Sequence, residues 1–177
     1  MNESHLESKR LRLVPISPAD VRAKIEAMSA ADKAQLSADW LALLTGAIAP
    51  DPWVHGFSMV HRDSGGGVGS AGFKGPPDNE GVVEIAYAVE PEHQGRGFAT
   101  EAATALVGYA LSCDRVRTVR AHTLPQANAS TRVLSKCGFQ HVGEVMDPED
   151  GLVWRWELDR HRPPLTGASP GVIARNL

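Results

Sequence analysis

The stretch from Val82 to Ser112 most constrains what this chain can fold into. VVEIAYAVE (Val82 to Glu90) is almost continuously apolar, which is typical of a central strand covered on both faces. From about Gly97 to Ser112, apolar residues recur at helical spacing. A turn containing Gly95 and Gly97 joins the two. Glycine at such a turn serves either a backbone conformation that other residues avoid or the approach of an anion to the N–H groups of the helix start.

The rest of the sequence predicts one mixed α/β (α+β) domain. Strand patterns recur in further runs: Arg10 to Ile16, Trp53 to Arg62, Gly67 to Gly75, Val116 to Leu124, His141 to Met146 and Leu152 to Leu158. Helical patterns occur in other runs: Ser17 to Met28, Ser29 to Gly46 and Ser130 to Phe139. The expected order is strand, two helices, three strands, helix, strand, helix and two strands.

Composition and charge limit the class of protein. Residues 1–159 are expected to form the domain, and the proline-containing segment 160–177 a mobile tail. A net charge of -3 argues against a nucleic-acid-binding protein. The start of the chain is polar, and no run reaches the roughly 18 apolar residues of a membrane helix. Cys113 and Cys137 lack metal-ligand spacing and are expected to be buried free thiols. We therefore expect a cytoplasmic protein with no metal and no membrane or nucleic-acid partner.

Two phosphate-binding motifs can be set aside. A dinucleotide-binding fingerprint needs a third glycine, but Thr100 stands in its place. The run DSGGG (Asp63 to Gly67) joins two strand patterns, and Lys74 is followed by glycine and proline and not by a helix, so a hairpin is predicted there and not a P-loop. The Gly95–Gly97 turn, followed by a helix, remains suited to a diphosphate, because converging N–H groups and the helix dipole both favour an anion.

The motifs together resemble those of a known family. VEIAYAVEPEHQGRGFATEA, the later NASTRVLSKCGF and the early ESKRLRLVPIS are similar in order and spacing to the RimJ/RimL-like branch of the GNAT N-acetyltransferase superfamily. Gln94, Gly97 and Ala99 match its [Q/R]xxGx[G/A] motif, and Glu84 to Tyr87 its EI[G/A]Y motif. The resemblance spans about Glu7 to Leu158.

This resemblance implies a fold, a cosubstrate and a reaction. The fold would be a splayed mixed sheet of about seven strands flanked by about four helices, with acetyl-coenzyme A (acetyl-CoA) in a V-shaped opening between the strands Val82 to Glu90 and Val116 to Thr123. An acetyl group would pass to a primary amine, a protein N-terminus or a small molecule, by direct attack in a ternary complex. The main chain would pair with the pantetheine arm at Tyr87, Ala88 and Val89. The pyrophosphate would be wrapped by the segment Gly95, Arg96, Gly97, Phe98, Ala99 and Thr100, with Gln94 in the motif and Asn128 as a further contact.

Acetyl transfer needs a deprotonated amine and a stabilised thiolate, and three side chains are candidates for these roles. Glu84 stands in an apolar strand, where a carboxylate is costly unless it has a purpose; it is either a base acting through water or a structural carboxylate. Ser130 matches the serine of the branch, as a proton donor to the thiolate or as a helix N-cap. His122 is the reserve base or a surface residue.

The sequence departs from the family at two places. The position of the tyrosine that serves as general acid in many members holds Leu134, and Ala127 stands where a cofactor-contacting asparagine often lies. A coenzyme A-binding sensor without turnover, and a plain interaction domain, therefore remain alternatives to the enzyme. The acceptor, and the choice between monomer and homodimer, stay open at this point.

Overall fold

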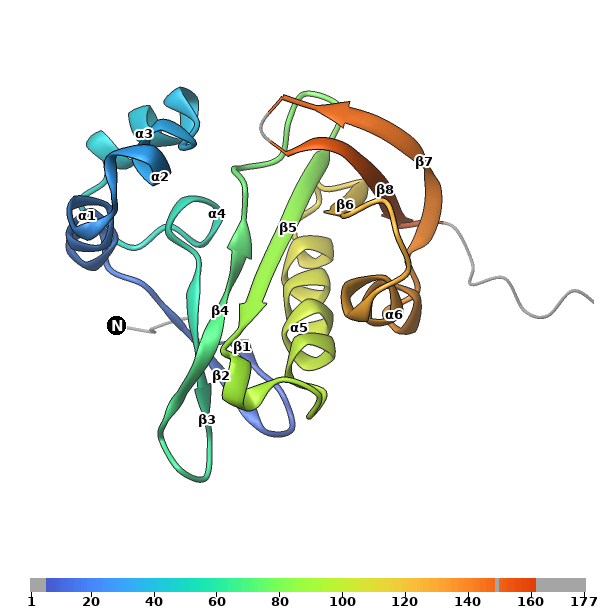
Figure 1. Cartoon of the computed structure of the whole chain (residues 1–177), viewed down its shortest axis with the longest axis horizontal. Helices are drawn as coiled ribbons and strands as arrows, with labels where there is room; N and C mark the ends of the chain where they lie inside the picture. Colours follow the sequence, from blue (N-terminus) through green and yellow to red (C-terminus); the bar gives the residue numbers. More distant parts are fainter. Residues whose placement is uncertain (1–5, 149, 162–177) are drawn as a thin grey trace, which may run out of the picture.

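The computed structural model describes residues 6–148 and 150–161, which form one open mixed sheet with helices on both faces (Figure 1). The described strands are β1 (Leu6–Glu7), β2 (Leu11–Pro15), β3 (Phe57–His61), β4 (Gly67–Phe73), β5 (Val82–Val89), β6 (Thr118–Thr123), β7 (Gln140–Asp147) and β8 (Gly151–Asp159). The described helices are α1 (Pro18–Ala27), α2 (Ala30–Ala34), α3 (Ala38–Thr45), α4 (Pro52–His55), α5 (Phe98–Ser112), α6 (Ala129–Lys136) and the 3-10 turn η1 (Pro91–His93).

The sheet is antiparallel except where β5 meets β6. Its strand order is β1-β2-β3-β4-β5-β6-β8-β7. The parallel pairing of β5 and β6 runs only from Val82↔Thr118 to Glu84↔Arg120, and the rest of β5 has no partner on β6. The two strands therefore part halfway along β5, which confirms the splayed mixed sheet expected from the sequence.

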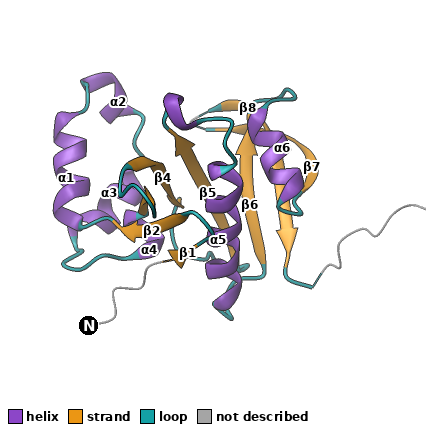
Figure 2. Ribbon diagram, turned by 90° about the horizontal axis from the view of Figure 1, so that it is seen from below, coloured by secondary structure: helices purple, strands orange, loops and turns teal. Residues whose placement is uncertain are grey.

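One face of β5 packs on α5, and the opposite face is open. Val83 and Ile85 point to the α5 side and belong to the main core, together with Ala103 and Leu106 of that helix. In Figure 2, α5 and α6 lie side by side on this face of β5 and β6. Ala86, on the other face, is exposed. The expectation that β5 is covered on both faces was wrong for its second half, because alanine methyl groups are too small to require burial.

Two predicted capping residues lie at helix ends in the structure, one at a start and one after an end. Ser17 caps α1 by accepting from the Asp20 N–H at 3.1 Å, with Pro18 as the first helical residue. Gly138 follows α6 with φ +89°, a left-handed conformation that suits the glycine expected after a helix end.

The segment before the hairpin differs from the prediction. The single helix expected from Ser29 to Gly46 is broken into α2 and α3, because the Ser37 side chain caps a new helix at the Trp40 N–H. The strand expected from Trp53 starts only at Phe57, since Asp51 and the following proline begin α4. The two-residue β1 was also missed, as were two of the helices, so the described chain holds eight strands and six α-helices.

Other expectations meet the structure as follows. Cys113 and Cys137 are free thiols but are half-buried, not buried. Within the described chain, no helix has the length and apolar character needed to cross a membrane, and no cluster of metal-ligating side chains is found. Of the predicted tail, residues 162–177 lie outside the described part.

Candidate functional site

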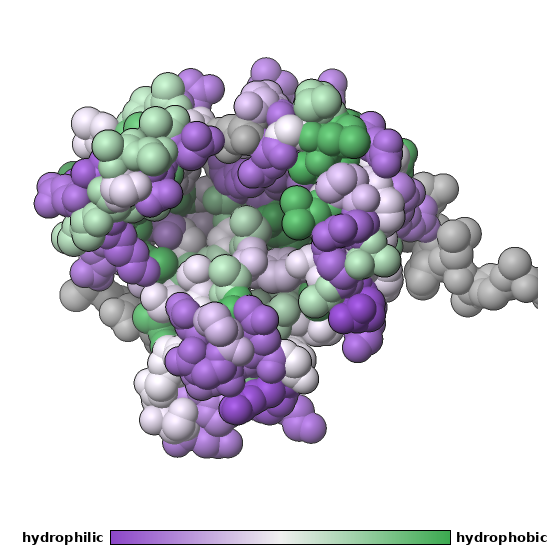
Figure 3. All heavy atoms as spheres, viewed as in Figure 1, coloured by the Kyte–Doolittle hydropathy of each residue, from purple (hydrophilic) through white to green (hydrophobic). Residues whose placement is uncertain are grey.

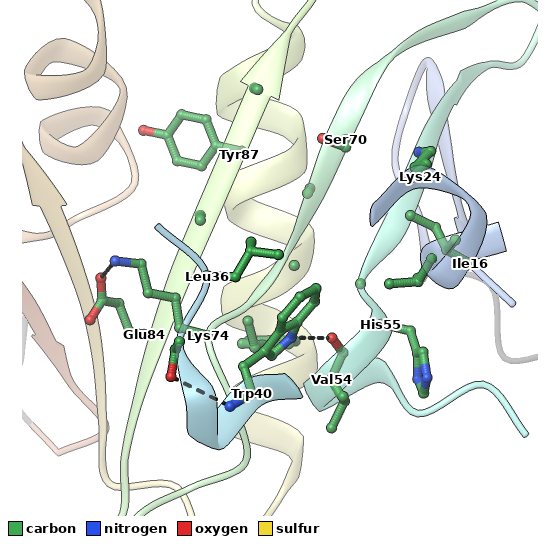
Figure 4. Close-up of a pocket in the computed structure, with 18 of the residues that line it drawn as sticks. Ile16, Lys24, Leu36, Trp40, Val54, His55, Ser70, Lys74, Glu84 and Tyr87 are labelled. Carbon is green, nitrogen blue, oxygen red and sulfur yellow. Dashed lines mark hydrogen bonds and ion pairs between the residues drawn. The ribbon is translucent and has the colours of Figure 1, made fainter. Parts of the chain in front are cut away.

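A pocket of about 690 Å³ lies on the open face of β4 and β5. Figure 3 shows it as a hollow between the helices α1–α3 and the strands β7 and β8. Small residues form its floor: Ser70, Gly72, Ala86 and Ala88. Glu84 and Lys74 lie at one end of the pocket, where β5 and β6 begin to part (Figure 4).

The Glu84 carboxylate is held by two partners on the same oxygen. Its Oε1 lies 3.0 Å from Lys74 Nζ and 3.0 Å from His122 Nδ1. Among the residues that the structure describes, Oε2 has no partner. Because the Glu84 side chain is 20% exposed and lines the pocket, a carboxylate oxygen is available there to a ligand or a water molecule.

A second contact indicates which ring nitrogen of His122 is the acceptor. Its Nε2 lies 3.3 Å from Arg155 Nε, which can only donate, so Nε2 is the acceptor and the ring proton stands on Nδ1. That proton is donated to Glu84. The His122 side chain is only 8% exposed, so the expectation of a surface histidine was wrong. The structure brings both predicted bases into one hydrogen-bonded chain, Arg155–His122–Glu84.

Lys74 and Arg155 are members of this site that the sequence reasoning missed. Burial lowers the pKa of Lys74, but pairing with Glu84 outweighs it, so the pKa lies above its usual value. The signal in the sequence was indirect: Lys74 follows β4 directly and Arg155 lies on β8. Only the strand pairing brings Lys74 to Glu84 and Arg155 to His122.

Ser130 is not the N-cap of α6. Asn128 caps that helix, accepting from the Thr131 N–H at 3.0 Å, and the Thr131 hydroxyl accepts in turn from the Asn128 N–H. The Ser130 hydroxyl instead lies near enough to the Tyr87 phenol to lower its pKa. The N-cap interpretation of Ser130 was therefore wrong. Leu134, at the place of the absent tyrosine, is fully buried.

Tyr87 reaches across the gap from β5 towards α6. In Figure 4 its ring points away from the cluster of Leu36 and Trp40. Burial, together with the nearby Cys137 thiol, raises the pKa of Tyr87 to about 12. The phenol is therefore a neutral hydrogen-bond donor at neutral pH. From the sequence, only the main chain of Tyr87 was predicted to contact the cosubstrate.

The main chain of β5 alternates between β4 and the gap. Lys74 N–H donates to Glu84 C=O, and Glu90 N–H to Val68 C=O, each at 2.9 Å, so even-numbered residues turn their amide groups to β4. Tyr87 and Val89 consequently turn theirs to the gap. Gln94 Nε2 donates to the Val89 carbonyl at 3.0 Å. Ala88, by contrast, bonds towards β4 and places its side chain at the pocket.

Both glycines of the turn before α5 adopt left-handed conformations, with φ +74° at Gly95 and +84° at Gly97. The steric explanation of these glycines therefore holds. A Cβ on Gly95 would meet nothing within 4 Å, so the outer side of the turn is open to a ligand. Arg96 is exposed there, whereas the Phe98 side chain is buried, which leaves only its main chain to a ligand.

Arg10 holds this turn against the sheet. Its Nη2 donates to the Arg96 carbonyl at 2.7 Å and its Nε to Glu101 Oε1 at 2.6 Å. The guanidinium also lies 4.8 Å from the Phe98 ring centre. Burial raises the pKa of Glu101, but hydrogen bonds from Ser8 and Arg10 lower it. The net result is a pKa below the usual value of this side chain. The helix start is thus fixed before any ligand binds.

The fold, the parted strands and the glycine turn define a class that the comparisons identify. Residues 10–140 match the family described as acetyltransferase (GNAT) domain, and the chain belongs to this family. An uncharacterized N-acetyltransferase of Bacillus subtilis, YjdG, is 35% identical over 89 residues, which are 50% of this chain and 51% of that protein. This chain therefore spans about half the length of the curated relatives that it matches.

Solved structures share the fold. RimL, a ribosomal alpha-N-protein acetyltransferase in complex with coenzyme A, is 13% identical with a TM-score of 0.66, covering 88% of this chain and 98% of that one. A spermidine N-acetyltransferase from Vibrio cholerae, in complex with coenzyme A and spermine, is 17% identical with a TM-score of 0.63, covering 86% and 96%. Because these sequence identities are low, the similarity to the two solved structures shows a shared fold alone.

Proposed function

We propose that this protein transfers the acetyl group of acetyl-CoA to a primary amine by direct attack in a ternary complex. The observation that carries the proposal is the position of Glu84, whose carboxylate lines a pocket at the point where β5 and β6 part. Family membership supports the proposal, as do the coenzyme A complexes of RimL and of the Vibrio cholerae enzyme.

The residues present fit acetyl-CoA. Tyr87 and Val89 turn main-chain groups to the gap, where the pantetheine arm would pair as an added strand. The left-handed turn at Gly95 and Gly97, which is open at Gly95, would receive the pyrophosphate at the start of α5. Acetyl-CoA supplies a thioester, whose C–S bond breaks as the amine nitrogen bonds to the acetyl carbon.

Glu84 is the base in this proposal. Its unpartnered Oε2 takes the proton of the incoming amine, directly or through one water molecule. His122 has one ring nitrogen bound to Glu84 and the other to Arg155, so both nitrogens are engaged and His122 positions the carboxylate. This arrangement favours Glu84 over the reserve base.

Ser130 and Tyr87 serve the departing thiolate. Their hydroxyl groups lie near each other, since Ser130 influences the pKa of Tyr87. With a pKa of about 12, the Tyr87 phenol keeps its proton at neutral pH and strengthens Ser130 as a donor. The sulfur takes up a proton through Ser130, which balances the proton that Glu84 removes from the amine.

A non-catalytic coenzyme A sensor is the second candidate, because the buried Leu134 offers no hydroxyl to the thiolate. Isothermal titration with acetyl-CoA tests whether the cosubstrate binds, and thiol release with an amine panel tests turnover. Binding followed by amine-dependent thiol release supports the enzyme. Binding without release from any amine would favour the sensor, and no binding would refute both.

A further inference from the structure

We propose that the acceptor is a primary amine carried on a single apolar group, aliphatic or aromatic, and not a polyamine. The inference rests on the proposed function and concerns the pocket in which Glu84 lies. Three features of the pocket support it: the walls are apolar, the charges of the lining are balanced, and the Glu84 carboxylate lies at one end with the apolar walls beyond it.

The walls above the strand floor are apolar. They are formed by side chains of α1, of α3 and of the segments beside them: Ile16, Val21, Ile25, Met28, Leu36 and Trp40. A volume of about 690 Å³ lies in the range of small-molecule sites, and such a lining holds a ligand by removing its apolar surface from water. Trp40 is fixed by a 2.8 Å hydrogen bond from its Nε1 to the Val54 carbonyl, so this wall has a defined shape.

The charges of the lining cancel. Two carboxylates, Glu84 and Asp147, stand against two ammonium groups, Lys24 and Lys74. Lys74 is already paired with Glu84 and lies 3.8 Å from Asp150, and Asp147 also acts on its charge. A polyamine carries several ammonium groups, each of which needs a carboxylate or water when it is bound. Among the described residues that line the pocket, carboxylates and ammonium groups are equal in number, so this lining has no surplus of negative charge to offer them.

The carboxylate and the apolar walls occupy different parts of the pocket. Figure 4 shows the Lys74–Glu84 pair at the left, Leu36 and Trp40 in the middle and Ile16 at the right. An amine bound at Glu84 Oε2 can therefore extend its remaining group along the small floor residues towards these walls. One cationic end and one apolar end match this layout.

The test compares three probe amines at equal concentration: phenethylamine, ethanolamine and spermidine. We expect kcat/KM for phenethylamine to exceed those for the other two by about tenfold or more, since each methylene in an apolar pocket contributes discrimination of at least that order. Higher or equal kcat/KM with spermidine or ethanolamine would overturn the inference while leaving acetyl transfer intact. Failure of all amines would overturn it together with the proposed function.

Aspartate substitutions test whether the apolar wall is the source of the preference for phenethylamine. Leu36→Asp and Met28→Asp place a carboxylate on the apolar wall, and Leu43→Asp places one on an exposed position of α3 outside the pocket. Met28 is 38% and Leu43 44% exposed, so both changes are compatible with folding. The two wall variants should lose about tenfold in kcat/KM for phenethylamine, with Leu43→Asp unchanged. Equal activity in wall and control variants, with melting temperatures alike, would refute the assignment of the wall.

Discussion

Replacing Glu84 by glutamine removes the basicity of this side chain while keeping its shape. The amide oxygen can still accept from Lys74 and His122, which both bond to Oε1. General bases contribute about 10²–10⁴-fold to rate, so Glu84→Gln should lower kcat by that factor. The affinity for acetyl-CoA should stay the same, because the proposed cosubstrate contacts lie on Tyr87, Val89 and the glycine turn.

The expected loss of stability is too small to mimic this effect. Lys74 is 38% exposed and can be solvated when its partner loses charge, so the broken ion pair costs at most about 1 kcal/mol. For a domain of this size such a change shifts the melting temperature by about 2–4 °C. A fold with about 5–15 kcal/mol of stability remains folded, so unfolding cannot account for a hundredfold loss of turnover.

The matched control is Glu157→Gln. Glu157 is a carboxylate of similar exposure, 23%, that pairs with Arg120 at 2.8 Å and does not line the pocket. We expect its turnover to equal that of the parent. The assay is steady-state thiol release over a pH series, with thermal unfolding of both variants. An unchanged kcat and pH profile for Glu84→Gln would refute the base assignment and shift it to His122.

Variants of Gly97 test the proposed pyrophosphate site, and a variant of Tyr87 tests the role of its phenol. Gly97→Glu should abolish acetyl-CoA binding in isothermal titration, because it adds an anion to the proposed pyrophosphate turn and its Cβ would lie 3.1 Å from Arg10 Nη2, which holds that turn. Gly97→Ala makes the same Cβ contact and carries the same left-handed backbone strain of about 1–2 kcal/mol without the charge, and it should still bind. Equal affinity of the glutamate variant would refute the phosphate site. Tyr87→Phe should lower kcat by about tenfold with little effect on cosubstrate affinity. The raised pKa of Tyr87 contributes stability that is present below about pH 10 and is lost as the pH rises through about 12, so urea unfolding of Tyr87→Phe should show less alkaline loss than the parent; identical alkaline curves would contradict this.

Local patterns of the sequence were enough to predict the strand-turn-helix unit and most of the sheet. The long apolar run of β5, the glycine turn and the periodic α5 each depend on residues that are neighbours in the chain. The break between α2 and α3 was missed because the stretch is helical in composition. Within it, the Ser37 side chain accepts a backbone hydrogen bond and so starts a new helix. A two-residue strand such as β1 carries no periodicity to detect.

The candidate site was predictable residue by residue but not as an arrangement. Glu84 and His122 stood out as a carboxylate in an apolar strand and a histidine at a strand end, each on its own. Their contact depends on the parallel register of β5 and β6, and the roles of Lys74 and Arg155 depend on the neighbouring strands. The link between Ser130 and Tyr87 likewise joins two segments that only the fold brings together.

Transfer of an isotope-labelled acetyl group from acetyl-CoA to an amine, followed by mass spectrometry, tests the central proposal most directly. We predict that a primary amine gains the label only when the protein and acetyl-CoA are both present. With Glu84→Gln the rate should fall at least about a hundredfold, and with Glu157→Gln it should not change. Binding of acetyl-CoA without label on any amine and without release of thiol would contradict an acetyltransferase function.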